Sequence, residues 1–231
     1  MQSMLKGFWV VPLTAKLGLV VVMAYLVVAV FAPVIAPYSE TEILGASYEL
    51  WSDKYPLGTD SLGRDMLSRL IFGARNTIGI ALAAVTLAFL VGGATGMLAA
   101  ILGGWYDTII SRIVDILMAI PSLVFALLIL TILGTSIPIL ILVIAVLDCT
   151  RVYRITRAAA MNVVVLEYVE VARLRGEGLW WVIRKEVLPN IMAPLLAEFG
   201  LRFCFVFLFI AALSFLGLGI QPPTADWGSM V

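Results

Sequence analysis

The chain has 231 residues, of which 62% are hydrophobic and only 13% are charged, and its formal net charge is zero. Because soluble domains contain about half apolar residues and roughly a quarter charged ones, this composition is typical of an integral membrane protein. The neutral charge disfavours nucleic-acid binding, and the absence of histidine excludes histidine-based metal ligation and general-base catalysis.

Five stretches are apolar enough to cross a bilayer as helices, which takes about 20 residues each. The first, Leu17 to Ala36, carries no charge and is longer than the apolar core of a cleaved signal peptide, which is the alternative interpretation. The second span, residues 77–102, contains Gly92 and Gly96, whose spacing predicts close packing against another helix. The third span, residues 113–133, contains Pro121, a candidate kink that would either shape a gate or fit the helix into the bundle. The fourth and fifth predicted spans are residues 137–152 and 191–218.

The loop between the first two spans, residues 36–76, carries both acidic and basic residues. Its segment from Asp60 onward is similar in composition to a calcium-binding loop but does not meet the EF-hand spacing. We predict instead that Asp60 caps an amphipathic helix that carries Leu62, Met66 and Leu70.

Lysine and arginine predict which side of the membrane each loop faces, because they are enriched on the cytoplasmic side. Lys6 and Lys16 precede the first span, and the segment from Arg151 to Lys185 contains seven basic residues. The loop 134–138 and the tail after the fifth span contain none. These positions predict a cytoplasmic N-terminus, an outer loop before the second span and a cytoplasmic loop at 153–190, although the mixed outer loop weakly opposes this orientation.

The most polar part of that cytoplasmic loop, residues 167–190, is predicted to be a helical hairpin. A short helix from Glu167 to Arg175 has its acids in the first turn and its arginines in the last, which suits the helix dipole. Gly176 is expected to end it in a left-handed conformation. A second helical piece covers Leu179 to Leu188, and Pro189 marks the next boundary. The apolar residues Val169, Ala172 and Leu174 of the first short helix offer a docking surface for another protein. The alternative interpretation is that the hairpin is a solvated loop.

This hairpin resembles the EAA loop of the membrane subunits of binding-protein-dependent ABC importers. The resemblance rests on Glu170-Val171-Ala172-Arg173, then Gly176, then Leu188-Pro189. Val171 departs from the usual alanine, and Glu186 stands where the pattern has an apolar residue.

Three further blocks resemble the second, C-type permease of the dipeptide/oligopeptide/nickel family. They are "YPLGTDSLGRDMLSRLIFGAR", "GGWYDTIISRIVDILMAIPSL" and "LSFLGLGIQPPTADWGSM". The resemblance covers most of the chain from Tyr55 onward. It implies an all-α membrane protein with a type I ABC importer transmembrane domain. Five spans are visible, and the sixth that the family would have is not among them. Residues 1–76 would form an N-terminal span and extracytoplasmic loop, and 77–231 the permease core.

The resemblance also implies the partners of such a subunit. A homologous permease would complete the path through the bacterial inner membrane, in which this multi-pass chain would be embedded in lipid. An extracytoplasmic binding protein would deliver peptides or related small solutes. Two cytosolic ATPase subunits would bind ATP and magnesium, so this chain would hold no cofactor and would not be an enzyme. It contains no phosphate-binding loop of its own.

Each motif residue has an expected role by the same analogy. The loop helix would couple to an ATPase groove, with Glu170 pairing a basic residue there and Arg173 flanking the groove. Ala172 and Gly176 would permit tight seating, and Leu188 and Pro189 complete the motif.

Charges inside the predicted spans are costly and usually face the bundle interior or water. Glu198 and Arg202 lie four residues apart, so they are expected to pair along the helix. They form either a substrate path, in which Arg202 attracts a peptide carboxylate, or a structural pair near the cytoplasmic end. Asp148 is open to the same two interpretations, and a salt bridge to Arg151, three residues further on, would suffice to explain it.

Two other functions remain as alternatives. A stand-alone channel or secondary transporter would more often show internal repeats and ionisable residues at mid-membrane. An intramembrane enzyme is disfavoured because the sequence has no histidine and no motif that joins a nucleophile to its base. The sequence leaves open whether the solute is a dipeptide, a longer peptide, a nickel chelate or a related small molecule.

Overall fold

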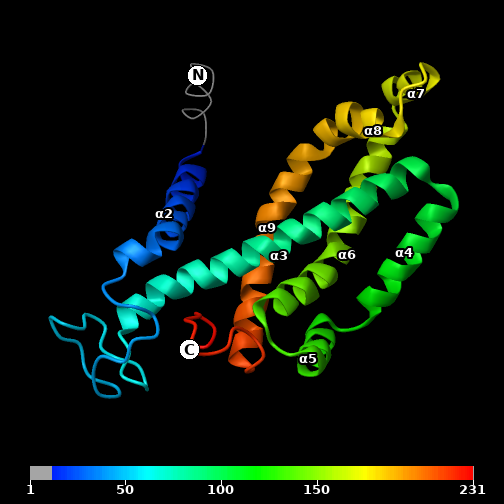
Figure 1. Ribbon diagram of the computed structural model, residues 1–231. Coiled ribbons are helices and arrows are strands. Elements are labelled where there is room, and N and C mark those ends of the chain that lie inside the picture. Colours follow the sequence, from blue (N-terminus) through cyan, green and yellow to red (C-terminus); the bar gives the residue numbers. More distant parts are fainter. Residues whose placement is uncertain (1–11, 231) are drawn as a thin grey trace. The chain divides into compact units, whose positions relative to one another are not determined.

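The computed structural model describes residues 12–230, which are helical apart from their connecting segments and contain no strand. The expected all-α fold is thus confirmed for this range. Lys6, which contributed to the predicted membrane orientation, lies outside the described residues. Figure 1 labels the helices along the chain. The elements are α2 (Leu13–Ile35), α3 (Met66–Leu102), α4 (Gly104–Ala119), α5 (Ser122–Leu133), α6 (Ile137–Val164), α7 (Glu167–Leu174), α8 (Leu179–Val182), the π-helix η1 (Ile183–Val187) and α9 (Leu188–Phe215).

Three described helices are long and apolar enough to cross a membrane: α2, α3 and the continuous segment Leu179–Phe215. Helices α4 and α5 pass the same test only as a pair. Helix α6 is not among them, because Asp148, Arg151 and Arg154 interrupt its apolar sequence. By length and composition, residues 12–230 therefore hold three spans, or four if the pair is one, where the sequence predicted five.

The kink predicted at Pro121 is confirmed and is larger than a bend within one helix. Helices α4 and α5 meet there at 87°, so residues 113–133 are not one continuous span. Ile120, with φ −88° and ψ 129°, has the extended conformation favoured before proline. Pro121 also lacks the N–H that would continue the hydrogen bonds of α4.

The chain divides into two compact units, which we describe separately. One comprises the described residues up to Gly79 together with Pro222–Met230, and the other comprises Ile80–Gln221. Helix α3 contributes to both, since its 37 residues run from Met66 to Leu102. The second span therefore begins well before residue 77, and no separate amphipathic helix precedes it.

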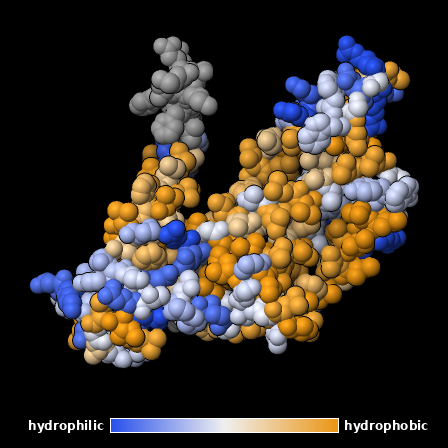
Figure 2. Space-filling model, in the orientation of Figure 1, coloured by the Kyte–Doolittle hydropathy of each residue, from blue (hydrophilic) through white to orange (hydrophobic). Residues whose placement is uncertain are grey.

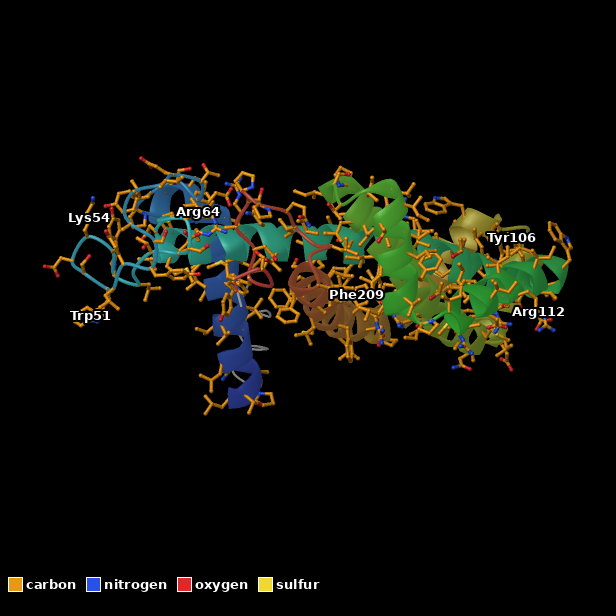
Figure 3. All side chains as sticks on the ribbon, turned by 90° about the horizontal axis from the view of Figure 1, so that it is seen from below. Trp51, Lys54, Arg64, Tyr106, Arg112 and Phe209 are labelled. Carbon is orange, nitrogen blue, oxygen red and sulfur yellow. The ribbon has the colours of Figure 1, made fainter. Side chains whose placement is uncertain are left out.

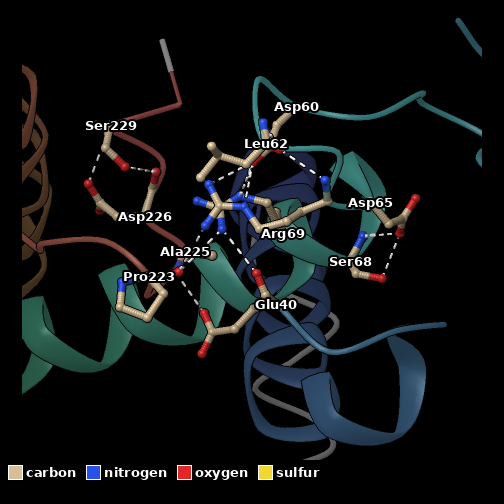
Figure 4. A network of polar contacts seen from close by, with 11 residues as sticks. Glu40, Asp60, Leu62, Asp65, Ser68, Arg69, Pro223, Ala225, Asp226 and Ser229 are labelled. Carbon is tan, nitrogen blue, oxygen red and sulfur yellow. Dashed lines mark hydrogen bonds and ion pairs between the residues drawn. The ribbon is translucent and has the colours of Figure 1, made fainter. Parts of the chain in front are cut away.

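A polar network joins the first loop, the start of α3 and the C-terminal segment within the first unit (Figure 4). Glu40 Oε2 accepts hydrogen bonds from the Ala225 amide at 2.7 Å and from the Asn76 side chain at 3.1 Å. The Thr77 hydroxyl donates to the carboxylate of Asp226 at 2.9 Å. Glu40 and Ala225 are 185 residues apart, so no local sequence pattern predicts this contact.

Asp60 belongs to this unit but does not cap a helix, contrary to our prediction. Its carboxylate instead accepts from the guanidinium groups of Arg64 at 2.7 Å and Arg69 at 3.3 Å. The first turn of α3 is capped by Asp65, whose Oδ2 accepts from the Ser68 amide at 2.8 Å. The acid five residues further along is therefore the cap, and Asp60 organises the turn before it.

The second unit has an apolar core to which α3, α5, α6 and α9 all contribute. Its fully buried members include Val85, Leu130 and Ile210. The close packing predicted at Gly92 and Gly96 is confirmed. A Cβ atom at Gly92 would lie 2.5 Å from the carbonyl oxygen of Cys149, and one at Gly96 would lie 2.7 Å from that of Tyr153.

The first prediction concerns this contact between α3 and α6. We expect Gly96→Ala to lower the free energy of unfolding by about 1–3 kcal/mol relative to Gly93→Ala, since overpacking forces backbones apart. Gly93 is the matched control, because a Cβ there meets no heavy atom within 4 Å. Thermal unfolding of both variants in detergent checks the difference, and equal midpoints would contradict close packing at Gly96.

The second prediction concerns pH. Burial raises the pKa of Asp60, but hydrogen bonds from the Arg64 and Leu62 amides and from the Arg64 side chain outweigh burial and hold the pKa below its usual value. A carboxyl with a lowered pKa in the folded state stabilises the fold above its unfolded pKa of about 3.9. That contribution is lost as the pH falls through the folded pKa.

Hydrogen-exchange protection in residues 58–70 should therefore fall as the pH drops below about 4. In Asp60→Asn the protection should already be low at neutral pH and should change little on acidification. Asp53→Asn, an exposed acid of the same loop, is the control and should keep the wild-type profile. A wild-type profile in Asp60→Asn would show that another group holds the turn.

Candidate functional site

The polar hairpin, residues 167–190, joins α6 to α9 and has the predicted form (Figure 1). Helix α7 ends at Leu174, and Gly176 follows with φ +82°. The Gly176 amide donates to the Arg173 carbonyl at 3.0 Å, and the Glu177 amide donates to the Ala172 carbonyl at 3.2 Å. This pair of bonds is a Schellman motif, which fixes the end of the helix and favours glycine at that position.

The apolar face of α7 points inward rather than outward. Val169 and Ala172 are 0% and 4% exposed, so our prediction that they form a docking surface is wrong. Val169 belongs to a cluster with buried residues of α6, α8, η1 and α9, which include Val182 and Val187. The small side chain of Ala172 therefore permits close packing within this chain.

The outer face of α7 is mixed in character. Glu170 and Arg175 are exposed, and they flank Val171 at 50% and Leu174 at 81% exposure. Hydrophilic residues gather around α7, whereas the surface of the longer helices is mainly apolar (Figure 2). Leu174 is therefore an exposed apolar side chain among charged ones, and its burial by a partner would be favourable.

The hairpin is also attached at its two ends. The Arg173 guanidinium donates to the carbonyl of Ile101 at 3.3 Å, where the last turn of α3 leaves carbonyls free. Leu188 is half-buried and is the first residue of α9. The boundary predicted at Pro189 is not a break, because Leu179–Phe215 is continuously helical; the helix changes there from the π-helix η1 to α9, where Pro189 has no N–H to donate.

A second group of charged residues lies near the middle of α6 and α9. The predicted pair is formed, with Arg202 Nε 2.5 Å from Glu198 Oε1. Arg151 Nη1 lies 3.4 Å from Asp148 Oδ1, also as predicted. The sequence did not indicate that Arg202 also reaches Asp148, at 3.7 Å across the two helices.

The position of this group corrects another expectation. Arg202 is about 20 Å from either end of α9, since each helical residue rises 1.5 Å. It therefore lies near mid-helix rather than close to the cytoplasmic end. The guanidinium of Arg202 is already paired with the carboxylates of Glu198 and Asp148, so it is not an unpaired cation that could attract a peptide carboxylate.

A cavity of about 250 Å³ opens beside these charges between α5, α6 and α9. Ser122 of α5, Asp148 and Arg151 of α6 and Arg202 of α9 supply its polar lining. Phe209, labelled in Figure 3, belongs to its apolar wall. Among residues 12–230, no group of three potential ligands could hold a metal ion.

A further ion pair, missed by the sequence reasoning, joins α4 to α6. The Arg157 guanidinium binds both carboxylate oxygens of Asp107 at 2.5 Å. The Tyr153 hydroxyl lies 2.8 Å from that of Ser111 and 3.4 Å from the same carboxylate. The only available signal was an acid in the first turn of α4, which alone specifies no partner.

Comparisons with known proteins cover both charged regions. The family model described as "Binding-protein-dependent transport system inner membrane component" matches residues 92–231. The di/tripeptide transport system permease protein of Pseudomonas aeruginosa is 40% identical over 221 residues, which cover 93% of this chain and 73% of the relative. The probable D,D-dipeptide transport system permease protein of Escherichia coli K12 is 36% identical over 229 residues, or 99% of this chain and 76% of the relative.

The third prediction tests the link between α4 and α6. A double-mutant cycle of Asp107→Asn and Arg157→Gln should give a coupling energy of about 1–3 kcal/mol, because the pair is bidentate and only partly exposed. Thermal unfolding of the four proteins measures it. Additive effects of the two substitutions would mean that each residue acts on stability independently of the other.

Proposed function

The chain belongs to the family of binding-protein-dependent transport system inner membrane components, and we propose that it is one of two paired permeases in an ATP-driven peptide importer. As a permease subunit of this family it is a multi-pass inner-membrane protein and not an enzyme. Relatives named for di/tripeptides and D,D-dipeptides support short peptides as its substrates.

The coupling element in this proposal is the polar hairpin. One observation carries the assignment: α7 is fixed to its own chain on one side and open on the other. Val169 is buried in the cluster below it, and Arg173 is bonded to the end of α3. Glu170 and Leu174 are left exposed. A rigid helix with a free outer face can transmit a push from an ATPase into α6 and α9.

The structure modifies the role that the motif residues have in this proposal. Ala172 and Gly176 act within the chain, where the first permits packing and the second permits the left-handed turn. Glu170 and Leu174 then supply the contact with the ATPase. Glu170 meets a basic residue of the partner, and Leu174 fills an apolar pocket there.

The remaining subunits follow from the same proposal. Two cytosolic ATPases hold ATP and magnesium, a second permease completes the path, and an extracytoplasmic binding protein delivers the peptide. The polar hairpin faces the cytoplasm together with the N-terminus, in agreement with the many basic residues between 151 and 185.

The fourth prediction tests coupling in the complex reconstituted with its partner subunits. Glu170→Lys should reduce both peptide uptake and substrate-stimulated ATP hydrolysis at least about tenfold, since reversing a buried interface charge costs several kcal/mol. Leu174→Ala should reduce both in parallel, because fully burying a leucine side chain is worth about 1.5–3 kcal/mol.

Glu167→Lys makes the same charge change on the same exposed helix and serves as the control. It should retain most of the coupled activity, because it precedes the motif. Full coupled activity in Glu170→Lys and Leu174→Ala would disprove docking through the outer face of α7. If all three variants assemble poorly with the ATPases, the hairpin as a whole is the docking surface, and the assignment to these two residues fails.

A further inference from the structure

The loop between α2 and α3 exposes large apolar side chains at residues 48–54, which we call the tip. Tyr48, Leu50 and Trp51 are 74%, 84% and 81% exposed. Figure 3 labels Trp51 at the outer end of this loop and Arg64 in its base. Exposed apolar patches that have a polar rim usually mark interaction sites. The tip is therefore a candidate docking surface within the first unit.

The backbone that carries the tip is held by hydrogen bonds. Tyr55 is 3% exposed, and its hydroxyl donates to the Leu44 carbonyl at 2.9 Å. The Thr59 hydroxyl donates to the Ala46 carbonyl at 2.7 Å and accepts from the Glu49 amide at 2.8 Å. The apolar side chains of the tip are therefore exposed on a fixed backbone, and their exposure does not come from a lack of local structure.

The backbone of the tip is also strained. Tyr48 has φ +56°, a left-handed conformation that bulky residues rarely adopt. Its amide donates to the Asp60 carbonyl at 3.1 Å, and a Cβ atom at Gly58 would clash with the carbonyl oxygen of Glu49. These close contacts hold the strained turn in place. Strain of this kind is typical of binding sites, where it fixes side chains in the geometry that a partner requires.

The composition of the tip indicates which kind of partner fits. Glu49, Ser52, Asp53 and Lys54 alternate with the apolar side chains and are all exposed. Permanent subunit interfaces resemble protein cores, whereas interfaces that form and separate keep a polar rim around a few aromatic anchors. A fluid lipid surface does not require a fixed geometry, and two acids against one lysine disfavour anionic headgroups. The tip therefore fits a soluble protein that docks and leaves.

We propose that residues 48–54 form a docking surface for the substrate-loaded binding protein, with Trp51 and Tyr48 as its anchors. This inference rests on the proposed function and orientation, in which the loop between α2 and α3 lies outside. The family of this chain is described as binding-protein-dependent, and a protein that delivers successive peptides has to dock and leave. Tryptophan and tyrosine are enriched among the residues that dominate binding energy, and Leu50 adds apolar area.

The tip is joined directly to the first turn of α3. The Met66 amide donates to the Gly58 carbonyl at 3.1 Å, and the Asp60 amide donates to the Arg64 carbonyl at 2.9 Å. A protein bound at the tip is therefore linked to α3 through a short, hydrogen-bonded segment. Docking would bear on a membrane span without passing through a flexible linker.

The test measures how tightly the cognate binding protein, loaded with dialanine, binds the complete importer in nanodiscs with a non-hydrolysable ATP analogue. Trp51→Ala should raise the Kd at least about tenfold, because truncation of an aromatic anchor commonly has an effect of this size. Leu50→Ala should raise it roughly threefold or more. In liposomes, the binding-protein concentration that gives half-maximal dialanine uptake should rise by the same factors, while maximal uptake should stay unchanged.

Two matched variants serve as controls. Trp105→Ala removes the same side chain at 75% exposure from α4, and Leu62→Ala truncates a leucine at 54% exposure in the base of the loop. Both should keep the wild-type Kd. The thermal unfolding midpoints of Trp51→Ala and Leu50→Ala should equal that of the wild type, because both side chains are exposed.

Three outcomes would overturn the inference. A wild-type Kd in both tip variants would show that the binding protein docks elsewhere. A lower unfolding midpoint of the assembled importer with an unchanged Kd would show that the second permease covers the tip. A loss of binding in anionic nanodiscs that disappears in detergent would show that the tip binds the membrane. Failure of the proposed function looks different, because the wild-type importer itself would then show no ATP-dependent uptake of dialanine.

Discussion

The structure of the second unit depends on one constraint, namely that a charge inside an apolar helix bundle must be paired. Helix α6 carries one acid, Asp148, and three arginines from Arg151 onward, which is why it does not qualify as an apolar span. Arg157 binds Asp107 of α4, and Asp148 binds Arg151 and Arg202. The Arg157–Asp107 and Asp148–Arg202 pairs tie α6 to α4 and α9, and Arg151 also donates to Ser122 of α5, so the residues that make α6 polar also fix its position among these helices. Most of the remaining charges of this unit lie in the polar hairpin, where water or a partner can meet them.

Local features were predictable because each depends on residues that are close in sequence. The turn at Gly176, the kink at Pro121 and the Glu198–Arg202 pair are examples. Helix packing at Gly92 and Gly96 was also predictable, since only small residues allow backbones to approach so closely. The identity of the helix against which they pack was not.

Features that depend on tertiary contacts were missed or wrong. The amphipathic pattern of α7 was correct, but a pattern cannot say whether its apolar face meets a partner or the same chain; the burial of Val169 and Ala172 decides this. Asp60 and Asp65 are both plausible caps by composition, and only the start of α3 at Met66 separates them. The link between Asp148 and Arg202 joins residues from helices whose register the sequence does not specify.

The polar hairpin and the charged group around Asp148 share the same two helices, α6 and α9. The hairpin leaves α6 at one end and enters α9 at the other, so in the proposed coupling mechanism a push on α7 would shift these helices relative to each other. Within the charged group the Glu198–Arg202 pair lies on one helix and is unaffected by such a shift. The Arg202–Asp148 contact crosses between the helices and is already the longest of the three, at 3.7 Å. Under the proposed coupling, a relative shift of α6 and α9 would therefore act on this contact before the other two, because the Asp148–Arg151 and Glu198–Arg202 pairs each lie within one helix. Such a stroke would change the pairing of buried charges between the two helices that the hairpin joins.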